Sequence, residues 1–107
     1  MEGLELICFK IISASGEAKS CYMEAIHHAR GGAFDKAQAS IEEGQEAYVQ
    51  GHRAHAELIQ QEASGESVGV SLLLLHAEDQ MMAADTIKLM ADEFIANYKR
   101  IQVLESK

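Results

Sequence analysis

The chain has 107 residues and a formal net charge of −8, from 9 basic and 17 acidic side chains. This balance argues against binding to nucleic acids or anionic membranes, both of which need clustered Lys and Arg. No apolar run approaches the length of a membrane span, and no signal-peptide pattern opens the chain. Hydrophobic residues make up 48%, with no Pro and no Trp. Together these features predict a single cytoplasmic, all-α domain over residues 1–107.

The first predicted helix covers residues 2–30, where apolar and small residues recur three and four positions apart. It ends at Gly31-Gly32, since glycine commonly closes a helix. Cys8 and Cys21 both fall in it, about 20 Å apart along the axis. A disulfide reaches only about 7 Å, so both cysteines are expected to be reduced and packed in the core.

The second predicted helix covers residues 34–63 and contains Gly44 and Gly51 on its packed side. Each glycine weakens a helix by about 1 kcal/mol relative to Ala, so this placement predicts that another helix approaches closely there. His52 and His55 lie three residues apart. They are either surface histidines or the start of a transition-metal site, which no neighbouring Cys or second His pair completes.

The third predicted helix covers residues 67–104, after Ser64-Gly65-Glu66-Ser67, and has two apolar stripes. Two stripes imply two packing surfaces, one for an antiparallel three-helix bundle and one for another subunit. The inner stripe comprises Leu73, Ala77, Ala84, Ile87, Ala91, Phe94, Tyr98 and Ile101. The outer stripe comprises Leu72, Leu75, Met82 and Leu89, interrupted by Asp79 and Thr86.

His76 and Asp79 place polar chemistry within this apolar region. A neutral imidazole nitrogen can attack phosphorus, so one interpretation of His76 is a phosphoryl acceptor. Gln80, one helical turn later, would then orient the ring or contact the phosphoryl group. The alternative is a histidine that merely packs at an interface.

Asp79 also has two interpretations. In an oligomer whose symmetry axis follows the third helix, copies of Asp79 would converge and repel one another unless they were protonated or bound a cation. Oxygen ligands favour Mg²⁺ or Ca²⁺. Otherwise Asp79 is a solvated side chain or part of an ion pair within the subunit.

Several segments resemble the lactose/cellobiose-type enzyme IIA components of the bacterial phosphotransferase sugar-uptake system, and the resemblance covers almost the whole chain. The active segment of that family usually reads His-x-Gln-Asp-His, and here it is His76-Ala77-Glu78-Asp79-Gln80. Glu78 and Gln80 are thus departures, the second replacing a histidine. The other matching segments are Lys10–Ser20 with its Gly16-Glu17-Ala18 motif, Ala33–Ala37, Glu62–Glu66, Met81-Met82 and Tyr98–Arg100.

The resemblance implies a homotrimer of three-helix subunits, forming a nine-helix bundle. It implies that His76 accepts a phosphoryl group from the general histidine phosphocarrier protein and passes it to a cysteine of the IIB component. It also implies that Asp79 gathers on the trimer axis around one divalent cation per trimer, with Mg²⁺ the expected ion. Contact with the membrane would be indirect, through the IIC permease.

Two other functions compete with this phosphocarrier. The first is a noncatalytic helical oligomer that serves as a regulator or adaptor on the same scaffold. The second is a metal-storage or metal-sensing bundle that uses His52 and His55. The phosphocarrier must form an acid-labile phosphohistidine, whereas neither alternative requires one.

Overall fold

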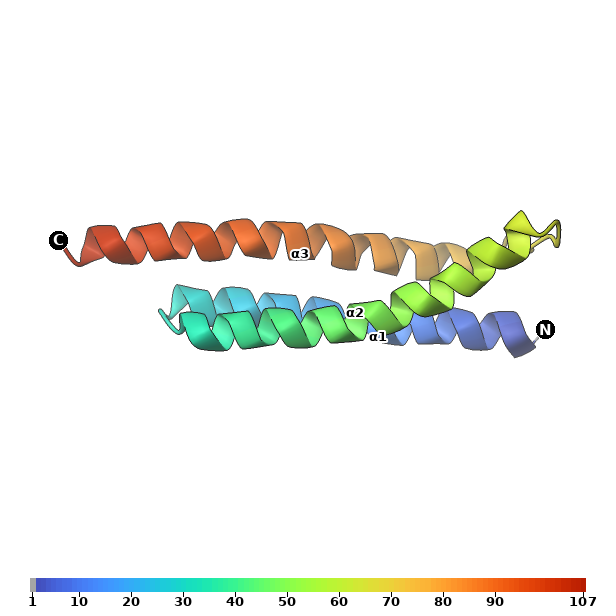
Figure 1. Cartoon of the computed structure of the whole chain (residues 1–107), viewed down its shortest axis with the longest axis horizontal. Coiled ribbons are helices and arrows are strands. Elements are labelled where there is room, and N and C mark those ends of the chain that lie inside the picture. Colours follow the sequence, from blue (N-terminus) through green and yellow to red (C-terminus); the bar gives the residue numbers. More distant parts are fainter. Residues whose placement is uncertain (1) are drawn as a thin grey trace.

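The computed structural model describes residues 2–107, and the side chains from residue 3 onward. It consists of three helices, α1 (Glu2–Arg30), α2 (Phe34–Ala63) and α3 (Leu72–Glu105). Figure 1 shows an up-down-up bundle in which α1 and α3 run in the same direction and α2 runs antiparallel to both. The bundle measures 61 × 21 × 17 Å. The predicted all-α three-helix bundle is confirmed.

The helix ends follow local backbone chemistry. After α1 the chain turns at Gly32, whose φ of +82° lies in the left-handed region that glycine adopts without strain. The predicted start of α3 at residue 67 was wrong, because the helix begins at Leu72. Ser71 caps it by accepting a hydrogen bond from the Leu74 N–H at 3.1 Å. Gly69 and the β-branched Val68 and Val70 precede this cap and disfavour helix.

α1 lies at the centre of the packing, since it contacts both α2 and α3 along much of its length, whereas α2 and α3 contact each other far less. Small side chains permit this close approach. Cys8 and Cys21 are buried and unbonded to each other, as expected, and burial raises the pKa of both thiols. The core alanines are Ala14, Ala18, Ala25, Ala29, Ala37, Ala47, Ala54, Ala77, Ala84 and Ala91. No helix within residues 2–107 is long and apolar enough to cross a membrane.

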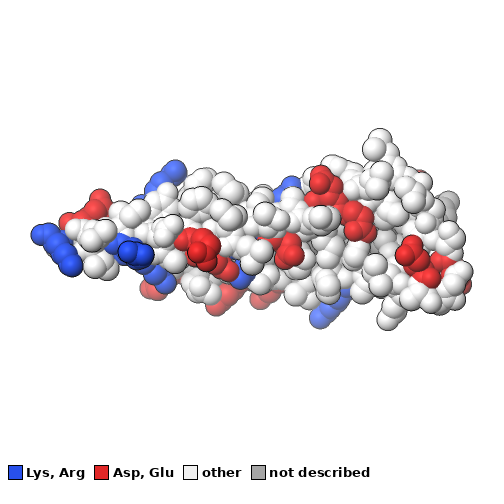
Figure 2. All heavy atoms as spheres, turned by 90° about the horizontal axis from the view of Figure 1, so that it is seen from above, with Lys and Arg blue, Asp and Glu red and all other residues white. Residues whose placement is uncertain are grey.

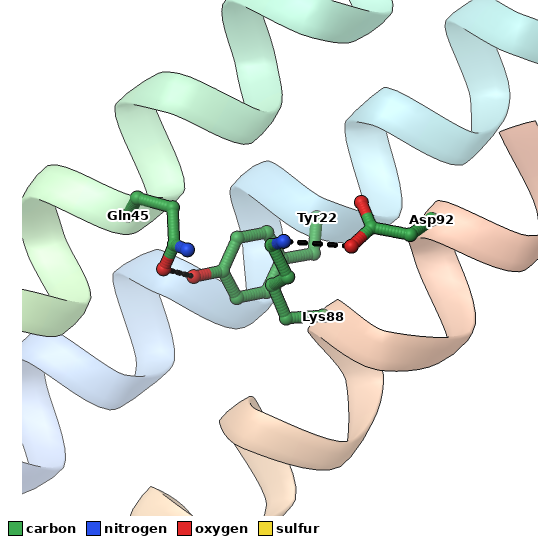
Figure 3. Close-up of polar contacts among 4 residues, drawn as sticks. All are labelled: Tyr22, Gln45, Lys88 and Asp92. Atoms are coloured by element: carbon green, nitrogen blue, oxygen red, sulfur yellow. Dashed lines mark hydrogen bonds and ion pairs between the residues drawn. The ribbon is translucent and has the colours of Figure 1, made fainter.

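Tyr22 is the largest fully buried side chain. Its O–H donates a hydrogen bond to Gln45 Oε1 on α2 at 2.9 Å, and the Lys88–Asp92 ion pair of α3 is drawn beside it in Figure 3. Burial raises the pKa of Tyr22 to about 12, with a smaller contribution from Tyr48. The hydroxyl therefore stays protonated and available as a donor throughout the physiological range.

The tyrosine ring occupies the space that Gly44 leaves open. A Cβ at Gly44 would lie 2.5 Å from Tyr22 Cε1, and one at Gly51 would lie 3.2 Å from the Cβ of Ala14. The predicted close approach of another helix at both glycines is confirmed. Glycine is therefore needed at position 44 for packing and not for backbone conformation, because its φ is not positive.

Gly44→Ala is therefore expected to destabilise the protein by about 1–3 kcal/mol, because the added methyl displaces a ring with no room to move. That loss outweighs the roughly 1 kcal/mol gain in helix propensity. Gly16→Ala is the control, since a Cβ added at Gly16 would meet nothing within 4 Å. Denaturant unfolding should show the control unchanged or more stable; equal stability of the two variants would contradict this view of the packing.

Candidate functional site

The outer stripe of α3 has no partner within the subunit. Its four members are 56–84% exposed, the most exposed being Leu72. Figure 2 looks onto the α3 side of the bundle, where charged side chains form separate groups with uncharged surface between them. The prediction of a second apolar stripe on α3 is thus confirmed, and this stripe faces outward.

The successive side chains of Glu78, Asp79 and Gln80 on α3 point to three different parts of the molecule. Residues along a helix are offset by about 100°. Glu78 turns toward α2, where its Oε1 lies 2.6 Å from His55 Nε2. Gln80 turns toward α1, where its Oε1 accepts a hydrogen bond from Lys19 Nζ. Asp79 lies between them and is exposed on the outer stripe.

His76 is exposed and lies one helical turn before Gln80, so both occupy the α1 side of α3. In the described part of the chain, its ring has no hydrogen-bonding side chain as a partner. An exposed imidazole is open to a macromolecular partner. The structure thus brings His76 and Gln80 to one face and separates both from Glu78, which is bonded to α2.

Lys19 gives this face a positive charge. Its side chain is half-buried, and the hydrogen bond to Gln80 joins residues 61 positions apart. Glu78 was the departure that placed negative charge closest in sequence to His76. Glu78 points to the opposite side and lies against His55, so it adds no carboxylate to the α1 side of α3, where the cation of Lys19 is held. The exposed carboxylate of Asp79, three residues after His76, lies on the neighbouring outer stripe.

Asp79 is the residue implied as a ligand of a divalent cation, so its surroundings show whether one subunit could bind such an ion. Residues 2–107 contain no group of three or more His, Cys, Asp or Glu side chains that could hold a metal within one subunit. One exposed carboxylate offers an oxygen ligand of the type that Mg²⁺ prefers. Its outward direction fits a site only if several subunits contribute their copies of Asp79.

The two other histidines proposed as metal ligands have local partners. The ring of His52 stacks on that of Tyr48, with centroids 6.3 Å apart and planes at 20°. His55 contacts Glu78 instead of joining His52 in a cluster. The described residues therefore lend no support to a transition-metal site at this pair.

Comparison with known proteins identifies the family. A family model described as the lactose/cellobiose-specific IIA subunit of the phosphotransferase system matches residues 6–99. The chain belongs to this family. It is therefore a IIA phosphotransferase component of a sugar phosphotransferase system of the lactose/cellobiose type.

Individual relatives agree with this assignment. The chain is 40% identical over 100 residues to the lichenan-specific phosphotransferase enzyme IIA component of Bacillus subtilis, covering 94% of this chain and 91% of that protein. It is 34% identical to the lactose-specific IIA component of Staphylococcus aureus, covering 92% and 96%. The crystal structure of the cellobiose-specific enzyme IIA from Bacillus anthracis superposes with a TM-score of 0.89 at 41% identity, covering 92% and 90%.

The sequence did not reveal the contact partners of Gln80 and Glu78. Lys19 belongs to a matching IIA segment, but nothing in its local spacing ties it to a glutamine on another helix. The same is true of His55 and Glu78. Both contacts depend on how the helices are rotated against each other, which short-range periodicity does not specify.

Glu78→Gln restores the residue usual in this family, and it is expected to change the rate of phosphoryl uptake by less than about twofold. The carboxylate lies on the side of α3 facing α2, and a partly exposed polar contact such as that with His55 contributes less than about 1 kcal/mol to stability. Gln80→Glu is the converse substitution, which adds a carboxylate instead of removing one. It should slow phosphoryl uptake at least about tenfold, because it places a negative charge on the side of His76. Initial rates of phosphorylation measure both; a large effect of Glu78→Gln would contradict the separation of the two sides.

Proposed function

We propose that this IIA component is a histidine phosphocarrier with His76 as its acceptor. An unprotonated ring nitrogen of His76 attacks phosphorus on the phosphohistidine of the general histidine phosphocarrier protein. A new N–P bond forms as the donor's N–P bond breaks. In the second step a cysteine thiolate of the IIB component attacks the same phosphorus, forming an S–P bond and returning His76 to the neutral ring.

The observation that carries this proposal is the exposed imidazole of His76 on the α1 side of α3, separated from the carboxylate of Glu78. Both partner proteins must bring a reacting atom in line with the ring nitrogen, so a buried histidine would not serve. The amide of Gln80, one turn on and on the same face, is a candidate to contact or orient the phosphoryl group.

The unpartnered outer stripe supports the proposed homotrimer. Burying apolar surface contributes roughly 25 cal/mol per Å², so large exposed side chains such as Leu72 and Met82 favour association. Packing three α3 helices around one axis through their outer stripes gives the nine-helix bundle. The relay would operate in the cytoplasm and reach the membrane only indirectly, through the IIC permease.

This assembly brings three copies of Asp79 together. We propose that they hold one divalent cation per trimer, Mg²⁺ being the expected ion because the ligands are carboxylate oxygens. The cation would neutralise charge that is costly in an apolar interface. We assign the cation a structural role at the interface and not a step of phosphoryl transfer, which needs only the ring nitrogen of His76 and the reacting groups of the two partner proteins.

Intact-mass spectrometry after incubation with phosphoenolpyruvate, enzyme I and the general histidine phosphocarrier protein tests the proposed function. We expect one added phosphoryl group per subunit, lost in acid and transferred when the IIB component is added. The donor protein alone serves as a control that the relay is competent. No uptake with a competent relay would favour the noncatalytic regulator or adaptor.

A further inference from the structure

We propose that Lys19 is a positioning residue for phosphoryl transfer, and that it acts by fixing the amide of Gln80; this rests on the proposed function of His76. The contact joins the middle of α1 to the segment of α3 that carries His76. It is the cross-helix hydrogen bond on the α1 side of this segment, and it lies in a partly buried setting where water competes less for the donor.

The chemistry of the two groups determines which way the amide points. A lysine ammonium has three N–H donors and no acceptor, so only the oxygen of Gln80 can face it. With Oε1 accepting from Lys19 Nζ, Nε2 must point to the other side of the amide. The oxygen and nitrogen of a glutamine amide have similar shapes and are easily interchanged. Here the ammonium of Lys19 can only donate, so the atom of Gln80 that faces it must be the oxygen.

This orientation matters because His76 precedes Gln80 by four residues on the same helix face. The two N–H groups on Nε2 are available to the oxygens of a phosphoryl group carried by the ring. A flipped amide would instead present the lone pairs of Oε1 to a dianion and repel it. Lys19 thus excludes the unfavourable orientation before the phosphoryl group arrives, which is preorganisation of a donor.

The positive charge of Lys19 suggests a competing role, in which the ammonium contacts the phosphoryl group directly. The present hydrogen bond favours the indirect role, since the amide of Gln80 already takes one donor of the ammonium. The two roles differ in their dependence on Gln80. A positioning residue loses its effect when Gln80 is absent, whereas a direct contact does not.

A double-mutant cycle separates these roles. Lys19→Met removes the donor and the charge while keeping side-chain length, and Gln80→Leu removes the amide. Single-turnover phosphorylation of the trimer by the phosphorylated general phosphocarrier is measured over a range of donor concentrations. Lys19→Met should lower the rate at saturating donor about tenfold, with less than about twofold change in half-saturating concentration. The double variant should be no slower than Gln80→Leu alone.

Two further variants complete the design. Lys19→Arg keeps a cationic donor and should recover the rate to within about threefold of the wild type. Lys88→Met is the matched control, because Lys88 is another half-buried lysine, paired with Asp92 and three helical turns beyond His76. The Lys88→Met variant should accept the phosphoryl group at a rate within about twofold of that of the wild type. If Lys88→Met lowered the phosphorylation rate as much as Lys19→Met does, the effect would come from the loss of any positive charge on the protein, and the proposal would be overturned.

A second readout does not depend on phosphorylation. The side-chain amide resonances of Gln80 in the free protein should shift in Lys19→Met and stay unchanged in Lys88→Met, since only the first removes the hydrogen bond to Oε1. Unchanged resonances, or additive rate losses in the cycle, would overturn the positioning role. Failure of the wild type to accept a phosphoryl group would overturn the proposed function itself, and this result is distinguishable because the amide shift would remain.

Discussion

Replacing His76 with Gln should abolish phosphoryl uptake while leaving the fold intact. The imidazole is exposed and bonded to no other described side chain, so its loss removes no packing and no structural hydrogen bond. A glutamine amide has a high helix propensity and the length of the original side chain, but no nucleophilic nitrogen. We expect the rate of phosphoryl uptake to fall at least about a thousandfold, while the free energy of unfolding stays within about 1 kcal/mol of that of the wild type.

The measurement is intact-mass spectrometry of the variant beside His52→Gln. His52 is also exposed on a helix, and its ring stacks on Tyr48 away from the proposed site, so it is a matched histidine control. The control should take up one acid-labile phosphoryl group as the wild type does. An acid-labile phosphoryl group on His76→Gln would show that another side chain is the acceptor.

Replacing Asp79 with Leu should stabilise the trimer and remove any dependence on a divalent cation. Asp79 is exposed in the subunit and lies among the apolar residues of the outer stripe, so the subunit loses no internal contact. In the proposed trimer the three converging carboxylates would repel one another, and replacing buried charges by apolar residues of similar volume is often neutral or stabilising by about 1–4 kcal/mol. We expect a higher thermal midpoint that a chelator does not lower.

Thr86→Leu is the matched control, because Thr86 is the other polar interruption of the same stripe and carries no charge. It should gain apolar contact while keeping the chelator sensitivity of the wild type. Thermal unfolding with and without chelator, together with sedimentation, measures both effects. A monomeric and clearly less stable Asp79→Leu variant would rule out the axial placement of Asp79.

Much of the fold followed from local patterns. Helical periodicity and the glycine pair after Arg30 predicted α1 and α2 with their observed bounds. Gly44 and Gly51 predicted close helix packing, because glycine in a helix interior costs stability unless its missing side chain makes room for a neighbour. The start of α3 was misplaced by five residues, since the cap at Ser71 depends on a hydrogen bond and an extended backbone that periodicity does not report.

Some features of the candidate site could likewise be predicted from the sequence, and others depend on the tertiary structure. The sequence by itself determined the bounds of α1 and α2, the two stripes of α3 and the presence of His76 and Asp79 within that helix, because each depends on spacing along one helix. Only the tertiary structure decided that Glu78 turns to His55 and Gln80 to Lys19. Those contacts depend on the rotation and axial position of each helix, which are set by the summed packing of the small core residues across α1.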